Sequence, residues 1–149
     1  MAETIIKLIP RLHTYRTARA RADAAAEVLK KLMNAEEVSV RLSDRPEFVD
    51  CGAHLKEIRC PRCGAPVPRG WWREKMNEMY AADHFFVLEQ EMPCCTKQVS
   101  FNDLRYDAPC GFSCLEFTVH GAQNAAGAEV IDNLGERFGL LFRAVEKEE

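Results

Sequence analysis

The sequence lacks any apolar run long enough to cross a lipid bilayer. Its apolar runs, such as residues 140–142, are far shorter than the roughly 20 residues that a membrane-spanning helix needs. Residues 1–10 contain Glu3 and Lys7, so they also lack the basic start and continuous apolar centre of a signal peptide. These absences predict a cytoplasmic protein without a membrane partner.

The sequence also lacks the short motifs of common catalytic sites. It contains no phosphate-binding glycine loop and no dinucleotide-binding fingerprint. Its four histidines do not have the spacing of a metalloprotease helix or of a local nucleophile motif. They are His13, His54, His84 and His120. An enzyme is therefore the hypothesis with the least support from the sequence.

What the sequence does have is cysteine. The chain holds seven cysteines among 149 residues, with 47% hydrophobic and 29% charged residues, a composition typical of a globular protein. An odd number of cysteines in a chain without an export signal favours metal binding over a disulfide framework.

Four of the cysteines form two pairs with the pattern of a metal site. Cys60 and Cys63 are separated by two residues and followed by Gly64, which can adopt the positive φ that a tight turn needs. Cys94 and Cys95 follow thirty residues later. Together the four sulfurs would complete a tetrahedron around zinc, the expected cofactor.

Residues 60–102 resemble a zinc ribbon, of the kind found in uncharacterised small bacterial proteins. The second turn departs from the family pattern because Cys94 and Cys95 are adjacent, so both can reach one metal only if the backbone turns sharply between Pro93 and Thr96. Two alternatives stay open. One residue of the adjacent pair could be replaced by Cys110, Cys114 or His84, or all seven cysteines could be small core residues without a metal.

The regions on either side of this segment show the same order of elements. Periodicity predicts a strand at 5–9, a helix from Thr17 to Asn34 and a strand at 38–42 that ends at 44–46. It then predicts a strand at 112–120, a helix at 124–138 and a strand at 140–145. An antiparallel sheet of four strands with two helices on one face would result, an α+β fold that resembles the ferredoxin-like split β-α-β arrangement in topology only.

The expected organisation is thus an α+β scaffold, residues 1–59 with 103–149, that carries an inserted zinc ribbon, residues 60–102. Within the insertion we expect a helix at 70–82 and strands at 85–91 and 97–102. Trp71 and Trp72 lie on this helix, where they could cover the metal lobe, or one of them could contact another protein.

Four sulfur ligands leave zinc no open position, which favours a structural site and a protein-recognition or adaptor role. The alternative is nucleic-acid binding, because basic residues flank the two tryptophans. They are Arg59, Arg62, Arg69, Arg73 and Lys75. Against it stands the charge: four thiolates add four negative charges and Zn²⁺ adds two positive ones, so the formal net charge of −3 would become −5.

A polar cluster follows the second cysteine pair. Its residues are Asn102, Asp103, Arg105 and Asp107. Such a cluster is typical of a solvated turn, although it could bind a ligand. Cys110 and Cys114, four residues apart, could suggest a redox pair, but on an extended strand their Cα atoms would lie about 13 Å apart, too far for a disulfide.

Overall fold

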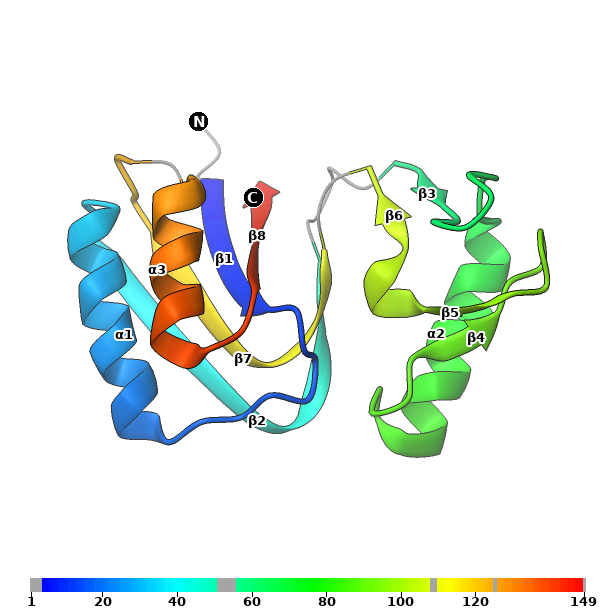
Figure 1. The fold of residues 1–149 in the computed structure, drawn as a ribbon, viewed down its shortest axis with the longest axis horizontal. Helices are drawn as coiled ribbons and strands as arrows, with labels where there is room; N and C mark the ends of the chain where they lie inside the picture. The colour runs from blue at the N-terminus through cyan, green and yellow to red at the C-terminus, as the bar shows by residue number, and fades with distance from the viewer. Residues whose placement is uncertain (1–3, 51–55, 108–109, 125, 149) are drawn as a thin grey trace.

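The computed structural model describes residues 4–50, 56–107, 110–124 and 126–148 (Figure 1). The described elements fall into a scaffold and a lobe beside it. The scaffold elements are β1 (Thr4–Pro10), α1 (Arg19–Leu32), β2 (Glu37–Val49), β7 (Gly111–His120), α3 (Ala128–Phe138) and β8 (Phe142–Glu148). The lobe elements are β3 (Ile58–Arg59), α2 (Arg69–Asp83), β4 (Glu89–Glu91), β5 (Gln98–Ser100), the 3-10 helix η1 (Phe101–Asp103) and β6 (Arg105–Tyr106).

The scaffold is a four-stranded sheet in the order β2-β7-β1-β8, and every neighbouring pair is antiparallel. Helices α1 and α3 lie on one face of it, and the lobe lies on the other side (Figure 1). This confirms the α+β class. The strand order is that of a ferredoxin-like sheet, in which each strand-helix-strand half places one strand at the centre and one at an edge.

The main core fills the space between the sheet and the two helices. Helix α1 contributes Ala22, Ala25, Ala26 and Leu29 at three- and four-residue spacing. Its small side chains let the helix approach the sheet closely, and larger side chains fill the space from the strands and α3. These include Leu8, Leu115, Phe117, Leu134, Phe138 and Phe142.

Helix ends differ from the prediction by a few residues. The N-cap of α1 is Ala18, without a side-chain hydrogen bond, so the predicted start of the helix at Thr17 was wrong. Helix α3 begins at Ala128 rather than at 124, with Gly127 as its N-cap. Propensity marks a helix end only loosely, because packing of the buried face decides how many turns form.

Strand β2 does not end at residues 44–46 as predicted. Its pairing with β7 passes from Leu42 opposite Leu115 to Glu47 opposite Ser113, so residues 43–46 face a single residue of the partner strand. Pro46 has no N–H to donate, and the chain leaves the ladder at a bulge and then rejoins it. The bulge lies in the sharp bend of β2, which carries the end of the strand toward the lobe (Figure 1).

The lobe is built of one helix and strands of two or three residues. Predicted strand 85–91 is confined to β4, because His84 and Phe85 have φ values of +55° and +68° and turn the chain at the end of α2. Predicted strand 97–102 is shortened to β5, after which η1 begins. A second apolar core lies inside the lobe. Its residues include Ile58, Trp72, Met79, Leu88, Met92 and Phe101.

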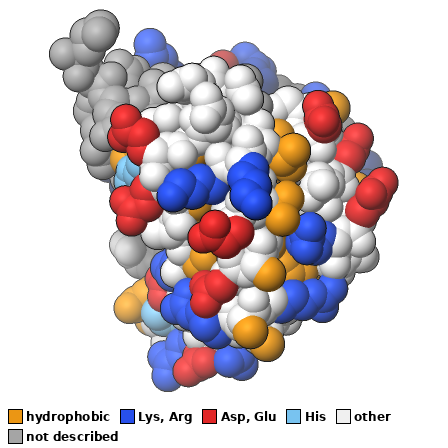
Figure 2. Space-filling model, turned by 90° about the vertical axis from the view of Figure 1, so that its left-hand side faces the viewer, with side chains coloured by type: hydrophobic (Ala, Val, Ile, Leu, Met, Phe, Trp, Pro, Cys, Tyr) orange, Lys and Arg blue, Asp and Glu red, His pale blue; other side chains and the backbone are white. Residues whose placement is uncertain are grey.

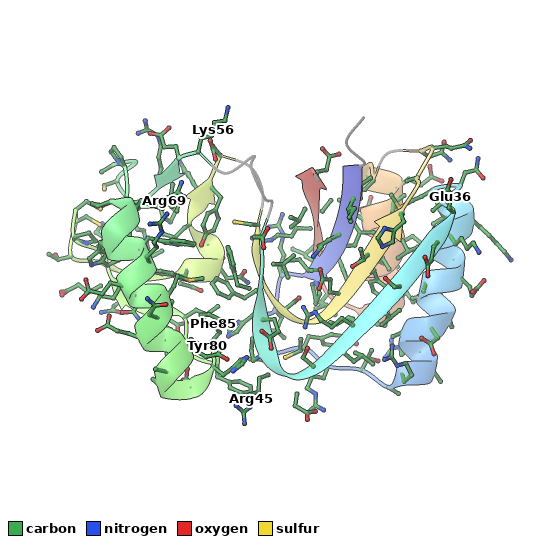
Figure 3. All side chains as sticks on the ribbon, turned by 180° about the vertical axis from the view of Figure 1, so that it is seen from behind. Glu36, Arg45, Lys56, Arg69, Tyr80 and Phe85 are labelled. Carbon is green, nitrogen blue, oxygen red and sulfur yellow. The ribbon has the colours of Figure 1, made fainter. Side chains whose placement is uncertain are left out.

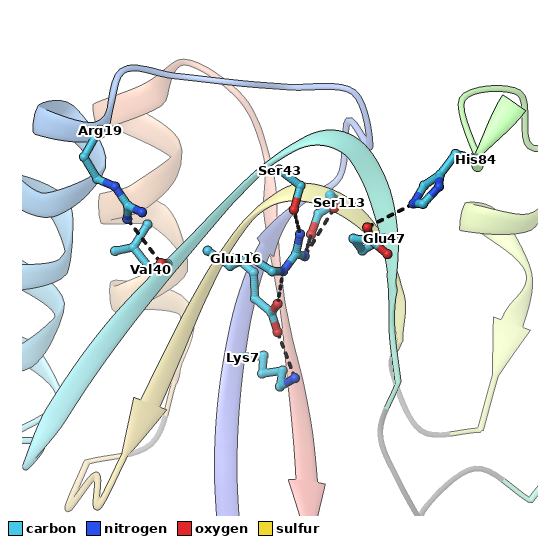
Figure 4. Close-up of polar contacts among 9 residues, drawn as sticks. Lys7, Arg19, Val40, Ser43, Glu47, His84, Ser113 and Glu116 are labelled. Atoms are coloured by element: carbon cyan, nitrogen blue, oxygen red, sulfur yellow. Dashed lines mark hydrogen bonds and ion pairs between the residues drawn. The ribbon is translucent and has the colours of Figure 1, made fainter. Parts of the chain in front are cut away.

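Scaffold and lobe make direct contact at the bent end of β2 and the start of β7. Phe48 and Phe112 pack into the lobe core, with the Phe48 ring centroid 5.7 Å from that of Trp72. The imidazole Nε2 of His84 lies 3.0 Å from the Glu47 carboxylate (Figure 4). Whether residues 60–102 fold as a unit of their own stays a prediction.

A buried ionic network lies on the strands of the scaffold (Figure 4). The Glu116 side chain is 7% exposed, and its carboxylate lies 2.9 Å from Lys7 Nζ and 2.7 Å from Arg41 Nε. Burial opposes its ionisation, but hydrogen bonds from Arg41 and Lys7 outweigh burial and lower the pKa of Glu116.

No helix in the described part of the chain is long and apolar enough to cross a bilayer.

Candidate metal centre

The first cysteine turn follows β3 and is closed by backbone hydrogen bonds. Gly64 N donates to Cys60 O over 2.9 Å, and Cys60 N donates to Ala65 O over 2.9 Å. Gly64 has a φ of +78°, the conformation that glycine adopts without strain. Arg62 N also points at Cys60 Sγ, 3.4 Å away. The turn therefore directs backbone donors at a sulfur, as a thiolate requires.

The second turn, between β4 and β5, has the same backbone. Thr96 N donates to Met92 O over 2.9 Å, Met92 N donates to Lys97 O over 3.0 Å, and Thr96 has a φ of +60°. Met92 thus occupies the position of Cys60, Cys95 that of Cys63, and Thr96 that of Gly64. The sharp turn that adjacent cysteines would need is present.

This correspondence explains the irregular spacing of the second pair. Both turns read X-Pro-X-Cys, at 60–63 and 92–95, and the second has methionine where the first has its leading cysteine. Cys94 supplies the missing thiol from the position held by Arg62 in the first turn. Sequence reasoning missed this alignment, although the shared proline and final cysteine could have revealed it.

The two turns face each other and bring all four sulfurs together. The four Sγ atoms lie within 4.8 Å of one another, with 3.9 Å between those of Cys60 and Cys95 and 3.3 Å between those of Cys63 and Cys94. A tetrahedral zinc with Zn–S bonds of about 2.3 Å would separate its sulfurs by about 3.8 Å. The cluster therefore has the dimensions of a four-thiolate metal site.

The four thiols differ in burial and acidity. Cys60 is fully buried, Cys95 is half-buried, and Cys63 and Cys94 are exposed. Burial opposes the ionisation of Cys60, but the N–H groups of Cys63 and Arg62 and the neighbouring thiols prevail and lower its pKa to about 7. Although the Cys94 side chain is exposed, partial desolvation by the surrounding turns, neighbouring thiols and the charge of Cys60 raise the pKa of Cys94 to about 12. A cation is what would allow all four to ionise together.

The structure does not place Cys110, Cys114 or His84 among these sulfurs. Cys110 and Cys114 are both fully buried, just before β7 and within it. His84 Nε2 lies against Glu47. Among the described residues, the one group of cysteine, histidine or acidic side chains that could hold a metal consists of Cys60, Cys63, Cys94 and Cys95.

The two tryptophans belong to the apolar core of the lobe. Trp72 is 8% exposed and packs between Phe48 and Tyr106, and Trp71 is half-buried with its ring centroid 5.7 Å from that of Phe101. They therefore act mainly as core residues.

Comparison with known proteins adds no relative: no family model, curated protein or solved structure matches the chain.

Proposed function

We propose that the four cysteines hold one structural zinc ion in a zinc-ribbon-type centre. The supporting observation is the pair of matching turns that gathers the four sulfurs within 4.8 Å. Four thiolates at tetrahedral spacing select zinc or iron among biological metals, and they leave zinc no open position for catalysis. The metal then serves to hold the lobe in shape.

Metal analysis of the purified protein tests this assignment. We expect inductively coupled plasma mass spectrometry to find one zinc ion per chain in the wild type. The Cys63→Ser variant should lose that zinc. Cys114→Ala is the matched control, because this buried cysteine lies outside the cluster. Iron in place of zinc would contradict the choice of metal, and a wild-type chain purified without any metal would contradict the site itself.

We further propose that the zinc-stabilised lobe recognises another protein. The tryptophans are packed inward, so the candidate contact residues are those that the fold leaves exposed: Tyr80 at 53%, Phe86 at 42% and Val87 at 55%. Figure 3 shows Tyr80 and Phe85 at the end of α2 that lies next to Arg45 in the bend of β2. Exposed aromatic and aliphatic side chains favour protein contacts, and these three come from residues 80–87, at the end of α2 and in the segment that follows it.

Site-specific photocrosslinking in cells tests the recognition surface. A photoreactive phenylalanine in place of Val87 should give a discrete protein adduct. The same group in place of exposed Lys30 on α1 should not, and the Val87 adduct should be lost when Cys63→Ser removes the metal. Equal adducts from both positions would contradict this surface as the place of recognition.

Nucleic-acid binding has weaker support, because several of the basic side chains near the tryptophans already contact other side chains of the protein. Arg59 pairs with Glu57 at 2.8 Å, Lys75 pairs with Glu78 at 3.1 Å, and the Arg69 guanidinium lies over the Trp72 ring. On the side that carries α1 and α3, acidic side chains lie between the basic ones (Figure 2). A complex with single-stranded DNA that forms at about 50 mM salt and disappears by about 200 mM would favour this alternative.

A further inference from the structure

A pocket opens where the scaffold meets the lobe, away from the metal centre. Three arginines from distant parts of the chain line it: Arg11 after β1, Arg105 on β6 and Arg143 on β8. Leu104, Tyr106 and Phe142 line it as well. The pocket therefore combines positive charge with apolar side chains.

Arg143 is held in place by the backbone around it. Its Nη1 donates to Cys110 O over 2.8 Å. The neighbouring residue is Gly111, and a Cβ there would lie 3.2 Å from Nη1 and 2.8 Å from Asn102 Oδ1. A guanidinium has five N–H donors, so Arg143 keeps others for a ligand. The missing side chain of Gly111 is what leaves room for this arrangement.

The backbone of Arg11 is held in place by a buried amide. Asn102 is 5% exposed; its Nδ2 donates to Arg11 O over 2.7 Å, and its Oδ1 accepts from Phe112 N over 3.1 Å. One side chain of the lobe thereby ties the end of β1 to β7. The polar cluster after the second cysteine turn, which resembles an ordinary solvated turn in the sequence, thus contains the residue that organises this junction.

The positive charge of the pocket is offset in part by Asp103, which acts on Arg143 from beyond ion-pair distance. Within the described residues, no acidic side chain forms an ion pair with Arg11, Arg105 or Arg143. Burial and then the charge of Arg11 lower the pKa of Arg143, and Asp103 opposes this from a greater distance than an ion pair. Like charges held together in this way are stabilised by an anion.

We propose that this pocket binds a small organic anion, whose carboxylate or phosphate group is held by Arg143 with Arg105 and Arg11 and whose apolar body lies against Leu104, Tyr106 and Phe142. Guanidinium groups bind both kinds of oxyanion through paired N–H donors. The site lies between scaffold and lobe, so an anion bound there contacts both.

The test is a titration of the full, zinc-loaded chain, followed by amide NMR shifts at constant ionic strength. Inorganic phosphate and hexanoate are added separately, to distinguish a phosphate from a carboxylate with an apolar tail. We expect saturable shifts at residues 104–106 and 142–144 with at least one probe, and a dissociation constant of about 1 mM. Arg105→Gln, at an exposed position, should weaken binding about tenfold.

Arg73→Gln is the matched control, because Arg73 is an exposed arginine on α2 outside the pocket and should leave binding unchanged. Arg143→Lys keeps the charge but loses the paired donors, so it should weaken binding several-fold without unfolding the chain. The proposal is overturned if neither probe saturates, or if Arg73→Gln weakens binding as much as Arg105→Gln does. Because zinc stays bound throughout, a negative result here leaves the metal assignment intact.

Discussion

The scaffold and the lobe achieve order by different means. The scaffold strands run for seven to thirteen residues and pack two helices over a continuous apolar core. The lobe strands have two or three residues each, too few for a hairpin to be stable alone. With so little hydrogen-bonded sheet, the lobe depends on its own apolar core and, as proposed above, on a metal held by the four converging sulfurs.

The largest expected effect is therefore removal of the metal. Cys60→Ser, or zinc chelation, should unfold residues 58–106 while the scaffold stays protected, since structural zinc contributes an apparent 10–16 kcal/mol, as an order of magnitude, in small domains. Hydrogen exchange read by mass spectrometry measures both regions at once. Uniform loss of protection across the chain would show that the two regions do not differ in this way.

The reverse experiment disturbs the scaffold. Phe117 is fully buried between sheet and helices, so Phe117→Ala should lower the free energy of unfolding by about 3–5 kcal/mol. Urea denaturation followed by circular dichroism gives this value, and the folded fraction should keep its zinc. Release of zinc from Phe117→Ala chains that remained folded would show that the scaffold core and the lobe are coupled. It would contradict the view that the two regions are stabilised by different means.

Within the lobe, the equivalence of the two turns can be tested by moving one cysteine of the second turn from position 94 to position 92. Cys94→Ser should weaken zinc binding by at least about tenfold, since even outer-shell changes cost about 10- to 100-fold. The double variant Met92→Cys with Cys94→Ser should recover much of that loss, because Met92 occupies in the second turn the position of Cys60 in the first. Competition with a chromogenic chelator measures both. Failure of the double variant to recover affinity would contradict the equivalence of the turns.

The smallest effect belongs to the ionic network of the scaffold. The pKa of Glu116 is lowered in the folded chain, so its contribution is complete above its unfolded pKa of about 4.5 and is lost as pH falls through the folded value. Glu116→Gln should cost about 1 kcal/mol at pH 7, and the difference from wild type should shrink in acid. Denaturation at pH 7 and at pH 3 checks this sign, and a difference that grew in acid would contradict it.

The elements that could be predicted are those with regular periodicity. The alternation at 115–119 predicts β7. The spacing of Ala18, Ala22, Ala25, Leu29 and Leu32 predicts a helix with one apolar face, and the structure buries Ala22, Ala25 and Leu29 of these. Prediction failed where a local sequence feature competes with strand pairing between segments that lie far apart along the chain. Pro46 ends a strand by local rules, but β7 offers a partner beyond the bulge, and β2 continues.

The cysteine cluster shows the same division. Cys60 to Gly64 form a turn whose geometry depends on adjacent residues alone, so its pattern identifies it. The second turn depends on Met92 and Lys97 closing around Pro93, and on the two turns meeting across the lobe, which spacing does not reveal. For Trp71 and Trp72 the sequence left two interpretations open, covering the lobe or contacting another protein. The fold packs Trp72 inward against Phe48 and Tyr106, which come from distant segments, so spacing alone could not choose between them.

The sequence by itself determined the α+β class, the strand-helix-strand order of both halves and the four cysteines that are the leading candidate ligands, because periodicity and turn chemistry act between near neighbours. Only the tertiary structure decided that the four sulfurs meet, that the tryptophans lie inside the lobe and that three arginines share one pocket. Those facts depend on contacts between residues that lie far apart along the chain, and such contacts exist only once the sheet and the lobe have folded against each other.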